Sequence, residues 1–320
     1  MSNYVTPLLL VGCGYMGAEY ASVLQALGIN FCVAGRSQQS AESFFHRTGI
    51  CPAAGGLKKY MKDQSVPPQE AIVAVSFESL YPVVKFLLQN GVRRILVEKP
   101  GGIHYEQIQE LSQMADQAGS QVFIAYNRRF YASVIQAKKC IAEDGGVSSF
   151  CFEFTEWAHK ISLLDKPAIQ LNHWFLGNST HVIDLAFYLG GMPAVMNAYT
   201  AGSLDWYKNA SSFSGAGLTV DGVPFAYHAD WESAGRWSVE ILTKKRKLLL
   251  CPLEELRFQQ RGSLVVEKMD IEDALDVDYK PGLYRQTSAF LTDASAPLLP
   301  LREHVKLCKF YRQIELGTSL

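Results

Sequence analysis

The sequence predicts an α/β protein of two domains, and two patterns of apolar residues lead to that prediction. In residues 1–125, short apolar runs alternate with helical patterns, which is typical of βαβ units around a parallel sheet. In residues 126–320, apolar and polar residues alternate, which indicates an α+β domain with a predominantly antiparallel, open-faced sheet. A chain of 320 residues is long enough for two such domains.

The first domain carries strand and helix signals in regular alternation. Apolar runs predict buried strands at residues 8–11, 31–34, 71–75, 95–97 and 122–125. Apolar spacing typical of helices falls between them, at residues 18–27, 81–89 and 105–118. Gly28 and Gly91 directly follow two of these helical segments, as glycines at helix C-termini do.

Strand-like alternation marks the second domain. It is clearest in residues 147–157, where Phe150, Phe152 and Phe154 share one face. The same period of two recurs at residues 225–231 and 237–242. Helical spacing predicts helices over residues 132–142, 178–189 and 301–316. Because the alternation leaves only one face of the sheet apolar, we expect one face to be covered.

Composition and charge exclude several classes of protein. The formal net charge of −1 gives no electrostatic basis for binding nucleic acid or an anionic membrane surface. No apolar run reaches the ~18 residues that span a bilayer, and the N-terminus lacks the features of a secretory signal. The seven cysteines are scattered without a CxxC pair, which argues against disulfides or a metal site. We therefore expect a cytoplasmic protein with no membrane, nucleic-acid or metal partner.

A glycine-rich loop joins the first predicted strand to the first predicted helix. Gly12, Gly14 and Gly17 form a GxGxxG motif, which also includes Tyr15 and Met16. In such a motif the glycines permit a tight turn, the approach of a pyrophosphate to the backbone, and close helix packing. The phosphates then lie at the positive end of the helix. Because strand, loop and helix follow in this order, the motif predicts a Rossmann domain that binds a dinucleotide through these residues.

The end of the second predicted strand bears on the choice of cofactor. Sites that select NAD usually place Asp or Glu there, about 20 residues beyond the glycines, to hold the ribose hydroxyls. This chain has Arg36 and Ser37 instead. Arg36 can pair with a 2′-phosphate and Ser37 can donate a hydroxyl, so the sequence favours NADP(H) over NAD(H). In the alternative interpretation, Arg36 is a solvated loop residue that only stacks on the adenine.

Glu98, Lys99 and Pro100 follow the strand predicted at residues 95–97, at the edge where open α/β sheets bind ligands. With the glycine loop and a later His-x-x-Asp, this Glu-Lys-Pro-Gly-Gly segment resembles the Gfo/Idh/MocA family of glucose-fructose oxidoreductase and inositol dehydrogenase, over essentially the whole chain. The resemblance implies that Lys99 lies beside substrate and nicotinamide, where an ammonium stabilises a developing alkoxide. The alternative is a surface lysine just past a strand. Glu98 and Lys99 are counted among the cofactor-binding residues. Glu98 is expected to orient Lys99 or the loop rather than react, and Pro100 is a candidate for a cis bond.

His181 matches the catalytic histidine of the family. A histidine, with an ordinary pKa of ~6.5, is suited to move a proton to or from a substrate hydroxyl. Asn178 and Asp184 share a helix face with it, and Asp184 is expected to position that turn rather than react. With Lys99, His181 and Asn178, Trp174 is an expected substrate contact. The alternative is a core histidine that only bonds to a neighbour.

Gly177 departs from the family pattern. Many family dehydrogenases have an Asp four residues before this histidine, so the usual Lys-Asp-His relay lacks its carboxylate here. Asn178 can replace its hydrogen bonding but cannot accept a proton to become neutral. The relay must therefore work through Lys99 and His181 or recruit another group.

Further residues complete the expected site. Asn127 and Arg128 lie in a segment that resembles the family's domain junction, where they would face nicotinamide or substrate. The alternative is an ordinary interdomain tether. Ser76, after the third predicted strand, is counted with them as cofactor-binding. The polar stretch 160–174 is expected to form a loop over the substrate cleft.

These features together predict an NADP-preferring dehydrogenase or reductase that transfers a hydride between the nicotinamide and a sugar, an inositol or a sugar-derived carbonyl or alcohol. One alternative is a reductase of a non-sugar acceptor, of the imine or tetrapyrrole type. Another is a non-catalytic NADP-binding sensor. Because an open sheet face commonly needs a cover, a homodimer or homotetramer through the second domain is expected.

Overall fold

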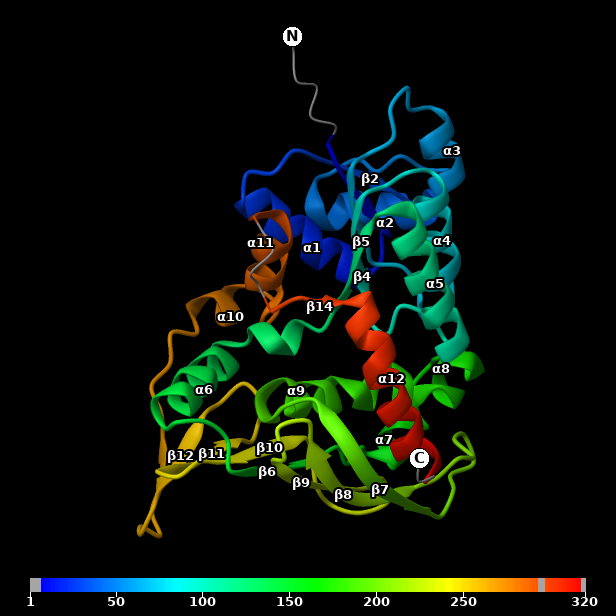
Figure 1. Ribbon diagram of the computed structural model, residues 1–320. Helices are drawn as coiled ribbons and strands as arrows, with labels where there is room; N and C mark the ends of the chain where they lie inside the picture. The colour runs from blue at the N-terminus through cyan, green and yellow to red at the C-terminus, as the bar shows by residue number, and fades with distance from the viewer. Residues whose placement is uncertain (1–6, 293–296, 318–320) are drawn as a thin grey trace. The chain divides into compact units, whose positions relative to one another are not determined.

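The computed structural model describes residues 7–292 and 297–317, which form two compact units (Figure 1). The first unit contains the described residues up to Tyr126 together with those between Leu283 and Val305. The second unit contains Asn127–Gly282 and the described residues from Lys306 onward. None of the helices in the described residues is long and apolar enough to span a membrane.

A six-stranded sheet forms the centre of the first unit, in the order β14-β5-β4-β3-β1-β2. The strands are β1 Leu8–Val11, β2 Phe31–Ala34, β3 Glu70–Val73, β4 Arg94–Glu98, β5 Gln121–Ala125 and β14 Leu299–Pro300. All neighbours pair in parallel except β14, which is antiparallel to β5. The predicted parallel sheet is therefore confirmed, and its strands begin or end within two residues of the predicted positions.

Helices cover both faces of this sheet. They are α1 Tyr15–Ala26, α2 Gln38–Thr48, α3 Leu57–Lys62, α4 Leu80–Gln89, α5 Tyr105–Ala118 and α11 Leu283–Thr292. Figure 1 shows α4 and α5 together on one side and α1 with α11 on the other. Gly28 and Gly91 follow α1 and α4 with φ of +66° and +79°, the left-handed conformation in which glycine ends helices without strain.

The chain returns to the first unit near its end. Leu299 pairs with Ile124 of β5. The Arg94 guanidinium lies over the rings of Phe123 and Phe290, and its Nε donates to the Phe290 carbonyl at 3.0 Å. This division differs from the predicted boundary, which placed every residue after 125 in the second domain. Periodicity identifies a helix or strand but does not show which sheet it joins.

An eight-stranded sheet dominates the second unit, in the order β13-β12-β11-β10-β6-β9-β8-β7. Its strands are β6 Ser149–Glu153, β7 Pro193–Ala201, β8 Ser212–Thr219, β9 Pro224–Asp230, β10 Ser238–Leu242, β11 Arg246–Leu250, β12 Arg257–Gln260 and β13 Val266–Lys268. Only the pair β6 and β9 is parallel among the described strands of this sheet. The predominantly antiparallel sheet is confirmed.

The second unit also contains helices and short turns. The helices are α6 Ala132–Glu143, α7 Ala158–Ile161, α8 Ala168–Asn172, α9 Thr180–Gly190, α10 Ala274–Asp278 and the latter part of α12 Leu301–Leu316. A 3₁₀ turn spans Asn127–Phe130, and a π-helical turn spans Phe175–Ser179. The helix predicted from residue 178 therefore begins at Thr180 after this π turn. The stretch expected as a loop, 160–174, is partly helical.

One face of the eight-stranded sheet is covered and the other is open. Phe150 and Phe152 are buried, and the ring of Phe187 from α9 packs edge-on against both, with centroids 6.2 and 5.6 Å away. On the opposite face, Val195 and Tyr199 of β7 are exposed, Tyr199 to 68%. The open-faced arrangement predicted from the alternating residues is confirmed.

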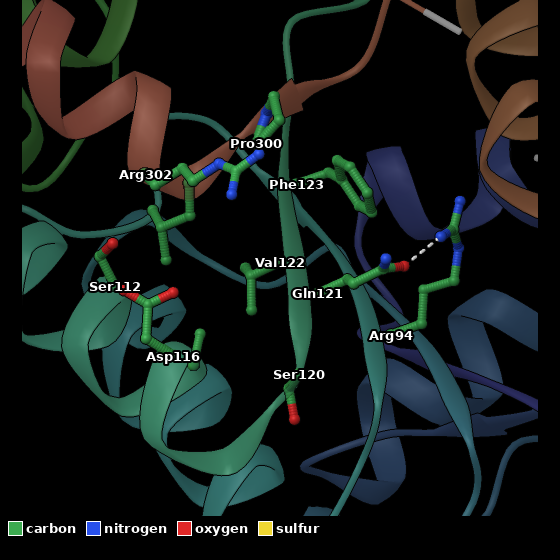
Figure 2. Close-up of a pocket in the computed structure, with 11 residues that line it drawn as sticks. Arg94, Ser112, Asp116, Ser120, Gln121, Val122, Phe123, Pro300 and Arg302 are labelled. Carbon is green, nitrogen blue, oxygen red and sulfur yellow. Dashed lines mark hydrogen bonds between the residues drawn. The ribbon is translucent and has the colours of Figure 1, made fainter. Parts of the chain in front are cut away.

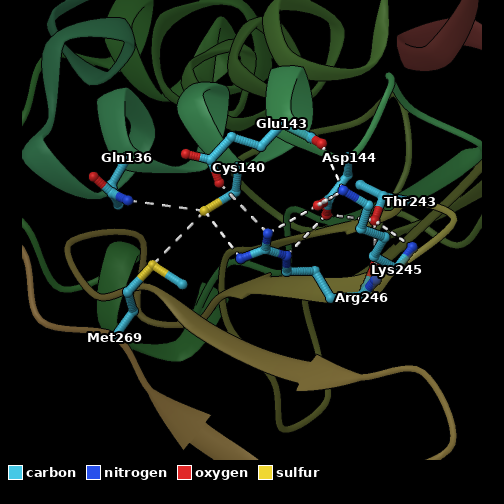
Figure 3. Close-up of polar contacts among 8 residues, drawn as sticks. All are labelled: Gln136, Cys140, Glu143, Asp144, Thr243, Lys245, Arg246 and Met269. Carbon is cyan, nitrogen blue, oxygen red and sulfur yellow. Dashed lines mark hydrogen bonds and ion pairs between the residues drawn. The ribbon is translucent and has the colours of Figure 1, made fainter.

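A buried ion pair joins α6 to β11 in the second unit (Figure 3). Arg246 donates from Nε and Nη2 to the two carboxylate oxygens of Asp144, each at 2.8 Å. Thr243 donates to the same carboxylate at 2.8 Å. The guanidinium also lies 3.6 Å from the Cys140 sulfur. These bonds compensate for the burial of Asp144, which follows the last turn of α6.

Candidate functional site

The glycine loop between β1 and α1 contains two glycines that the fold itself requires. A Cβ on Gly12, whose φ is +121°, would lie 2.2 Å from the Ala74 carbonyl oxygen. A Cβ on Gly17 would lie 2.1 Å from the Gly12 carbonyl oxygen. Both contacts are with backbone atoms, so neither position accepts a side chain without displacing the chain.

Gly14 is different, because the fold does not require its lack of a side chain. Its φ is −80°, and none of the described atoms lies within 4 Å of an added Cβ. It is exposed and caps the N-terminus of α1, whose first turn contains no acidic residue. The bare backbone and the positive end of the helix suit a pyrophosphate. The loop therefore fits the dinucleotide that the sequence predicts.

The expected cofactor residues of the first unit lie at one edge of its sheet. The glycine loop follows β1, Arg36 follows β2, Ser76 follows β3 and Lys99 follows β4. Because these strands are parallel, their carboxyl ends meet at the same edge. Tyr15 and Met16 begin α1 beside them, and Tyr15 is exposed. The structure thus places these residues at one edge of the sheet, and their contact with a cofactor stays a prediction.

The loop after β2 holds Arg36 and Ser37 in exposed positions. Ser37 caps α2, accepting a hydrogen bond from the Ser40 backbone N–H at 3.2 Å. Arg47 at the end of α2 donates to the Cys13 carbonyl of the glycine loop at 3.3 Å. No motif pointed to Arg47, because its distance from the loop depends on how α2 packs.

Glu98 at the end of β4 is held by α1. The Tyr20 hydroxyl donates to Glu98 Oε1 at 2.9 Å. Burial raises the pKa of Tyr20 well above its usual range, and the adjacent Glu98 carboxylate raises it further, so the hydroxyl stays a donor. The Lys99–Pro100 peptide is cis, and His304 Nε2 lies 3.1 Å from the Pro100 carbonyl oxygen. Ser76 donates to Glu78 at 2.6 Å.

In the second unit, His181 lies on the first turn of α9 and is largely buried. Its ring centroid is 6.3 Å from that of Trp237, the residue directly before β10. The Arg128 and Arg236 guanidiniums each lie over the Trp237 ring, 4.7 Å from its centroid. The structure therefore brings His181, Arg128, Trp237 and Arg236 together.

Asn178 and Asp184, expected on one face with His181, have separate partners. Asn178 lies in the π turn and donates to Glu156 Oε1 at 2.8 Å. Asp184 is buried in an ion pair with Arg129. The role expected for Asp184, to position that turn rather than react, stays a prediction.

Glu156 is a buried carboxylate that no motif indicated. Its side chain accepts hydrogen bonds from Asn178 and Ser179, and Arg236 lies 3.6 Å from its other oxygen. It is 1% exposed, and burial raises the pKa of its carboxyl despite these partners. The sequence did carry one signal, because Glu156 follows Phe150, Phe152 and Phe154 in the same alternation, which marks the covered face of the sheet. A carboxylate thus reaches the residue next to Gly177 from the segment after β6.

Two other expected residues have partners within the second unit. Asn127 Nδ2 donates to the Pro281 carbonyl at 2.9 Å. The Trp174 ring packs edge-on against Trp206, with centroids 6.1 Å apart. No cluster of three or more His, Cys, Asp or Glu side chains placed to hold a metal occurs among the described residues.

A cavity of about 260 Å³ in the first unit lies apart from these residues (Figure 2). Ser112 and Asp116 line it from α5, Val122 from β5 and Arg302 from α12. None of the expected site residues is part of its lining. It flanks β5, whereas the glycine loop follows β1.

Known proteins resemble this chain in sequence and in fold. Residues 7–126 match the sequence model of the Gfo/Idh/MocA "Oxidoreductase family, NAD-binding Rossmann fold". No curated protein sequence matches the chain. Among solved structures, an NAD binding oxidoreductase from Klebsiella pneumoniae is similar at 16% identity and a TM-score of 0.77, covering 97% of this chain and 96% of that one.

Two sugar-nucleotide proteins are also similar in fold. UDP-N-acetylglucosamine 3-dehydrogenase GnnA from Acidithiobacillus ferrooxidans has 14% identity and a TM-score of 0.74, covering 97% of each chain. WlbA dehydrogenase from Bordetella pertussis, in complex with NADH and UDP-GlcNAcA, has 17% identity and a TM-score of 0.72, covering 98% of each chain. The family match and the described glycine loop confirm the resemblance seen in the motifs. Residues 7–126 of this chain match the NAD-binding Rossmann domain of the Gfo/Idh/MocA oxidoreductase family, and the described residues share the fold of these solved structures.

Proposed function

We propose that this protein is an NADP(H)-dependent oxidoreductase that acts on a sugar, an inositol or a sugar-derived carbonyl or alcohol. The observation that carries the proposal is Gly14, whose open backbone caps α1 at the same sheet edge as Lys99. The first unit binds the dinucleotide, and the second supplies His181 and the substrate contacts. Two proteins of similar fold support this substrate class: UDP-N-acetylglucosamine 3-dehydrogenase GnnA and the WlbA dehydrogenase in complex with UDP-GlcNAcA.

Arg36 is the basis for proposing NADP(H). The loop after β2 offers an exposed guanidinium and no carboxylate between Ala34 and Ser37. A carboxylate there would repel a 2′-phosphate, whereas a guanidinium can bind it with charge-assisted hydrogen bonds. The WlbA structure described above contains NADH. We therefore expect a preference of this chain for NADP(H) to originate in Arg36 rather than in the shared fold.

Lys99 and His181 are the proposed catalytic residues. The bound nicotinamide supplies the hydride donor or acceptor. The Lys99 ammonium stabilises negative charge that develops on the substrate oxygen. His181 gives a proton to that oxygen in reduction and removes it in oxidation. Asn178, Trp174 and Arg128 contact the substrate or the nicotinamide in this proposal, and Tyr20 holds Glu98 beside Lys99.

Gly177 favours a second candidate function. Without an aspartate at that position, the relay expected for alcohol chemistry is incomplete, so the reduction of an imine or a tetrapyrrole-like acceptor is the alternative. Glu156 offers a carboxylate near the same turn, 2.8 Å from Asn178 Nδ2. That contact leads us to favour the sugar or polyol substrate.

Binding and turnover measurements on the purified protein test the proposal. We expect NADPH to bind more tightly than NADH in a fluorescence titration. We also expect loss or gain of the nicotinamide absorbance with members of a panel of sugars, inositols and their keto forms. Turnover confined to imines or linear tetrapyrroles would support the alternative acceptor. Tight NADPH binding without turnover of any compound would instead identify a sensor.

The open face of the eight-stranded sheet is the proposed surface for self-association. Val195, Tyr199 and Leu218 expose apolar side chains on neighbouring strands β7 and β8. Burial of such a face in a homodimer or homotetramer removes apolar area from water. Light scattering of the wild-type protein and of Tyr199→Glu tests this, and a wild-type monomer contradicts it.

A further inference from the structure

We propose that the substrate carries a carboxylate or phosphate group, and that Arg128 and Arg236 bind this anion beside His181. The inference rests on the proposed function, because it names the charge of the substrate handled at that site. All residues that carry it belong to the second unit.

Two guanidiniums converge on one indole. Arg128 lies in the 3₁₀ turn Asn127–Phe130, and Arg236 is the residue before Trp237. Each guanidinium lies 4.7 Å from the centroid of the Trp237 ring. An aromatic face attracts cations through its quadrupole and orients them without neutralising their charge. The Trp237 ring is thus in contact with two guanidiniums, and its centroid lies 6.3 Å from that of the His181 ring.

Arg128 lacks the carboxylate that other partly buried arginines of this unit have. Arg129 pairs with Asp184, and Arg246 pairs with Asp144. Among the described residues, Arg128 has no carboxylate oxygen within 4.0 Å, and its buried Nε makes no hydrogen bond. A charge taken out of water without a partner is costly, so an anionic ligand would supply what the described residues do not.

The carboxylate near Arg236 does not balance the cluster. Glu156 lies 3.6 Å from Arg236, while its other oxygen accepts hydrogen bonds from Asn178 and Ser179. Lys160 and Arg236 both lie over the Trp157 ring, at 4.2 and 4.9 Å. Three cations therefore lie over two indoles, and Glu156 is the carboxylate that pairs with the Arg236 guanidinium, while Glu153 accepts from the Arg236 backbone N–H at 3.1 Å.

The chemistry of the guanidinium defines the ligand. Its planar fork of N–H donors matches the oxygens of a carboxylate or a phosphate and binds either through charge-assisted hydrogen bonds. The half-exposed Arg236 side chain, at 48%, leaves the cluster accessible from solvent. An acid group bound here would place neighbouring carbons of the same molecule near His181.

Calorimetric titration in saturating NADP⁺ tests the proposal with three probes: D-glucuronate, D-glucose 6-phosphate and D-glucose. We expect at least one of the two acids to bind about tenfold or more tightly than glucose, the scale of one charge-assisted pair. Preference for glucuronate would identify a carboxylate site, and preference for the phosphate a phosphate site. If neither acid binds better than glucose, including the case in which no probe binds, the proposal is overturned.

Variants show whether the two arginines cause the preference. We expect Arg128→Gln and Arg236→Gln each to reduce it by about tenfold. Arg257→Gln is the matched control, because the Arg257 side chain has the same 48% exposure and pairs with Glu255 away from the cluster. An unchanged preference in Arg236→Gln, checked for folding by circular dichroism, also overturns the proposal. Preferential binding of an acid without nicotinamide turnover would support the anion site and contradict the proposed oxidoreductase activity. Turnover of neutral sugars alone would support the oxidoreductase activity and contradict the anion site.

Discussion

Arg129 donates to both carboxylate oxygens of Asp184, from Nε at 2.7 Å and from Nη2 at 2.5 Å. Both side chains are buried, and Asp184 keeps the pKa of the guanidinium above its usual value although burial alone would lower it. The pair joins the turn that carries Arg128 to the helix that carries His181. It therefore fixes the spacing between the two parts of the candidate site in the second unit.

Removing one partner of this pair should destabilise the protein. Asp184→Asn leaves Arg129 buried without a counter-charge, and such a change typically costs about 3–5 kcal/mol. Urea unfolding measures the loss. Asp205→Asn, which breaks an exposed pair with Lys208, is the control and should change stability by less than about 1 kcal/mol. Equal effects of the two substitutions would show that the buried pair contributes no more to stability than the exposed pair.

Gly14 and Gly17 should respond differently to alanine. The methyl group added in Gly14→Ala contacts no described atom, so the free energy of unfolding of this variant should stay within about 1 kcal/mol of wild type. NADPH affinity should nevertheless fall by at least about tenfold, because the methyl group occupies the space that a pyrophosphate needs. Gly17→Ala collides with the Gly12 backbone and should cost about 1–3 kcal/mol in unfolding. Unchanged NADPH affinity in Gly14→Ala would mean that the dinucleotide does not bind at this loop.

Lys99 and His181 should be needed for turnover. Lys99→Ala and His181→Ala should each lower kcat by a factor on the order of 10² or more, the usual scale for groups that stabilise charge or move protons. Nicotinamide absorbance follows the reaction, and NADPH titration checks that binding persists. The exposed residues Lys62 and His46 provide alanine controls. A variant with wild-type kcat would remove that residue from the mechanism.

Arg36 should determine the preference for NADP(H). Arg36→Glu replaces a charge-assisted partner of the 2′-phosphate by a like charge, so NADPH affinity should fall by about ten- to hundredfold. NADH affinity should change far less, because NADH lacks that phosphate. Fluorescence titration of both cofactors measures the ratio, with Arg93→Glu as the control for an exposed arginine that bonds to Ala118. Parallel losses for both cofactors would indicate that Arg36 only stacks on the adenine.

Asp144 should make stability sensitive to acid. Burial raises the pKa of its carboxyl, but hydrogen bonds from Arg246 and Thr243 outweigh burial and hold that pKa below the usual range. A carboxyl with a depressed folded-state pKa stabilises the protein above its unfolded value of about 3.9, and the contribution is lost as pH falls through the folded value. Urea unfolding between pH 6 and pH 3 should therefore show a steeper loss for wild type than for Asp144→Asn. Parallel curves would exclude this carboxyl as a source of acid sensitivity.

Much of the fold could be predicted because burial leaves a clear periodicity in the sequence. Leu8–Val11 reads as a buried strand since every side chain in it is enclosed, and the alternating phenylalanines before Thr155 mark a sheet with one covered face. The glycine loop could be recognised because a side chain at Gly12 or Gly17 would collide with backbone atoms, so only glycine fits at these positions. In each case a local physical requirement restricts the residues that fit.

The remaining features depend on contacts between distant parts of the chain. The place of α11 in the first unit follows from contacts of Arg94 with Phe290, which are 196 residues apart. Glu156 approaches Asn178 only because the segment after β6 meets the π turn before α9. The roles of Lys99, His181 and the other site residues stay predictions, which the substitutions above address.

The return of residues 283–292 and 297–305 to the first unit has a consequence for biosynthesis. The edge strand β14 and helix α11 are translated after nearly the whole second unit, so the nascent Rossmann domain emerges from the ribosome incomplete. Until they arrive, Phe123 and the free edge of β5 lack their native cover, and such surfaces promote aggregation during synthesis. A fragment ending near Tyr126 should accordingly be poorly soluble when expressed alone, and co-expression of the missing segment should improve its yield.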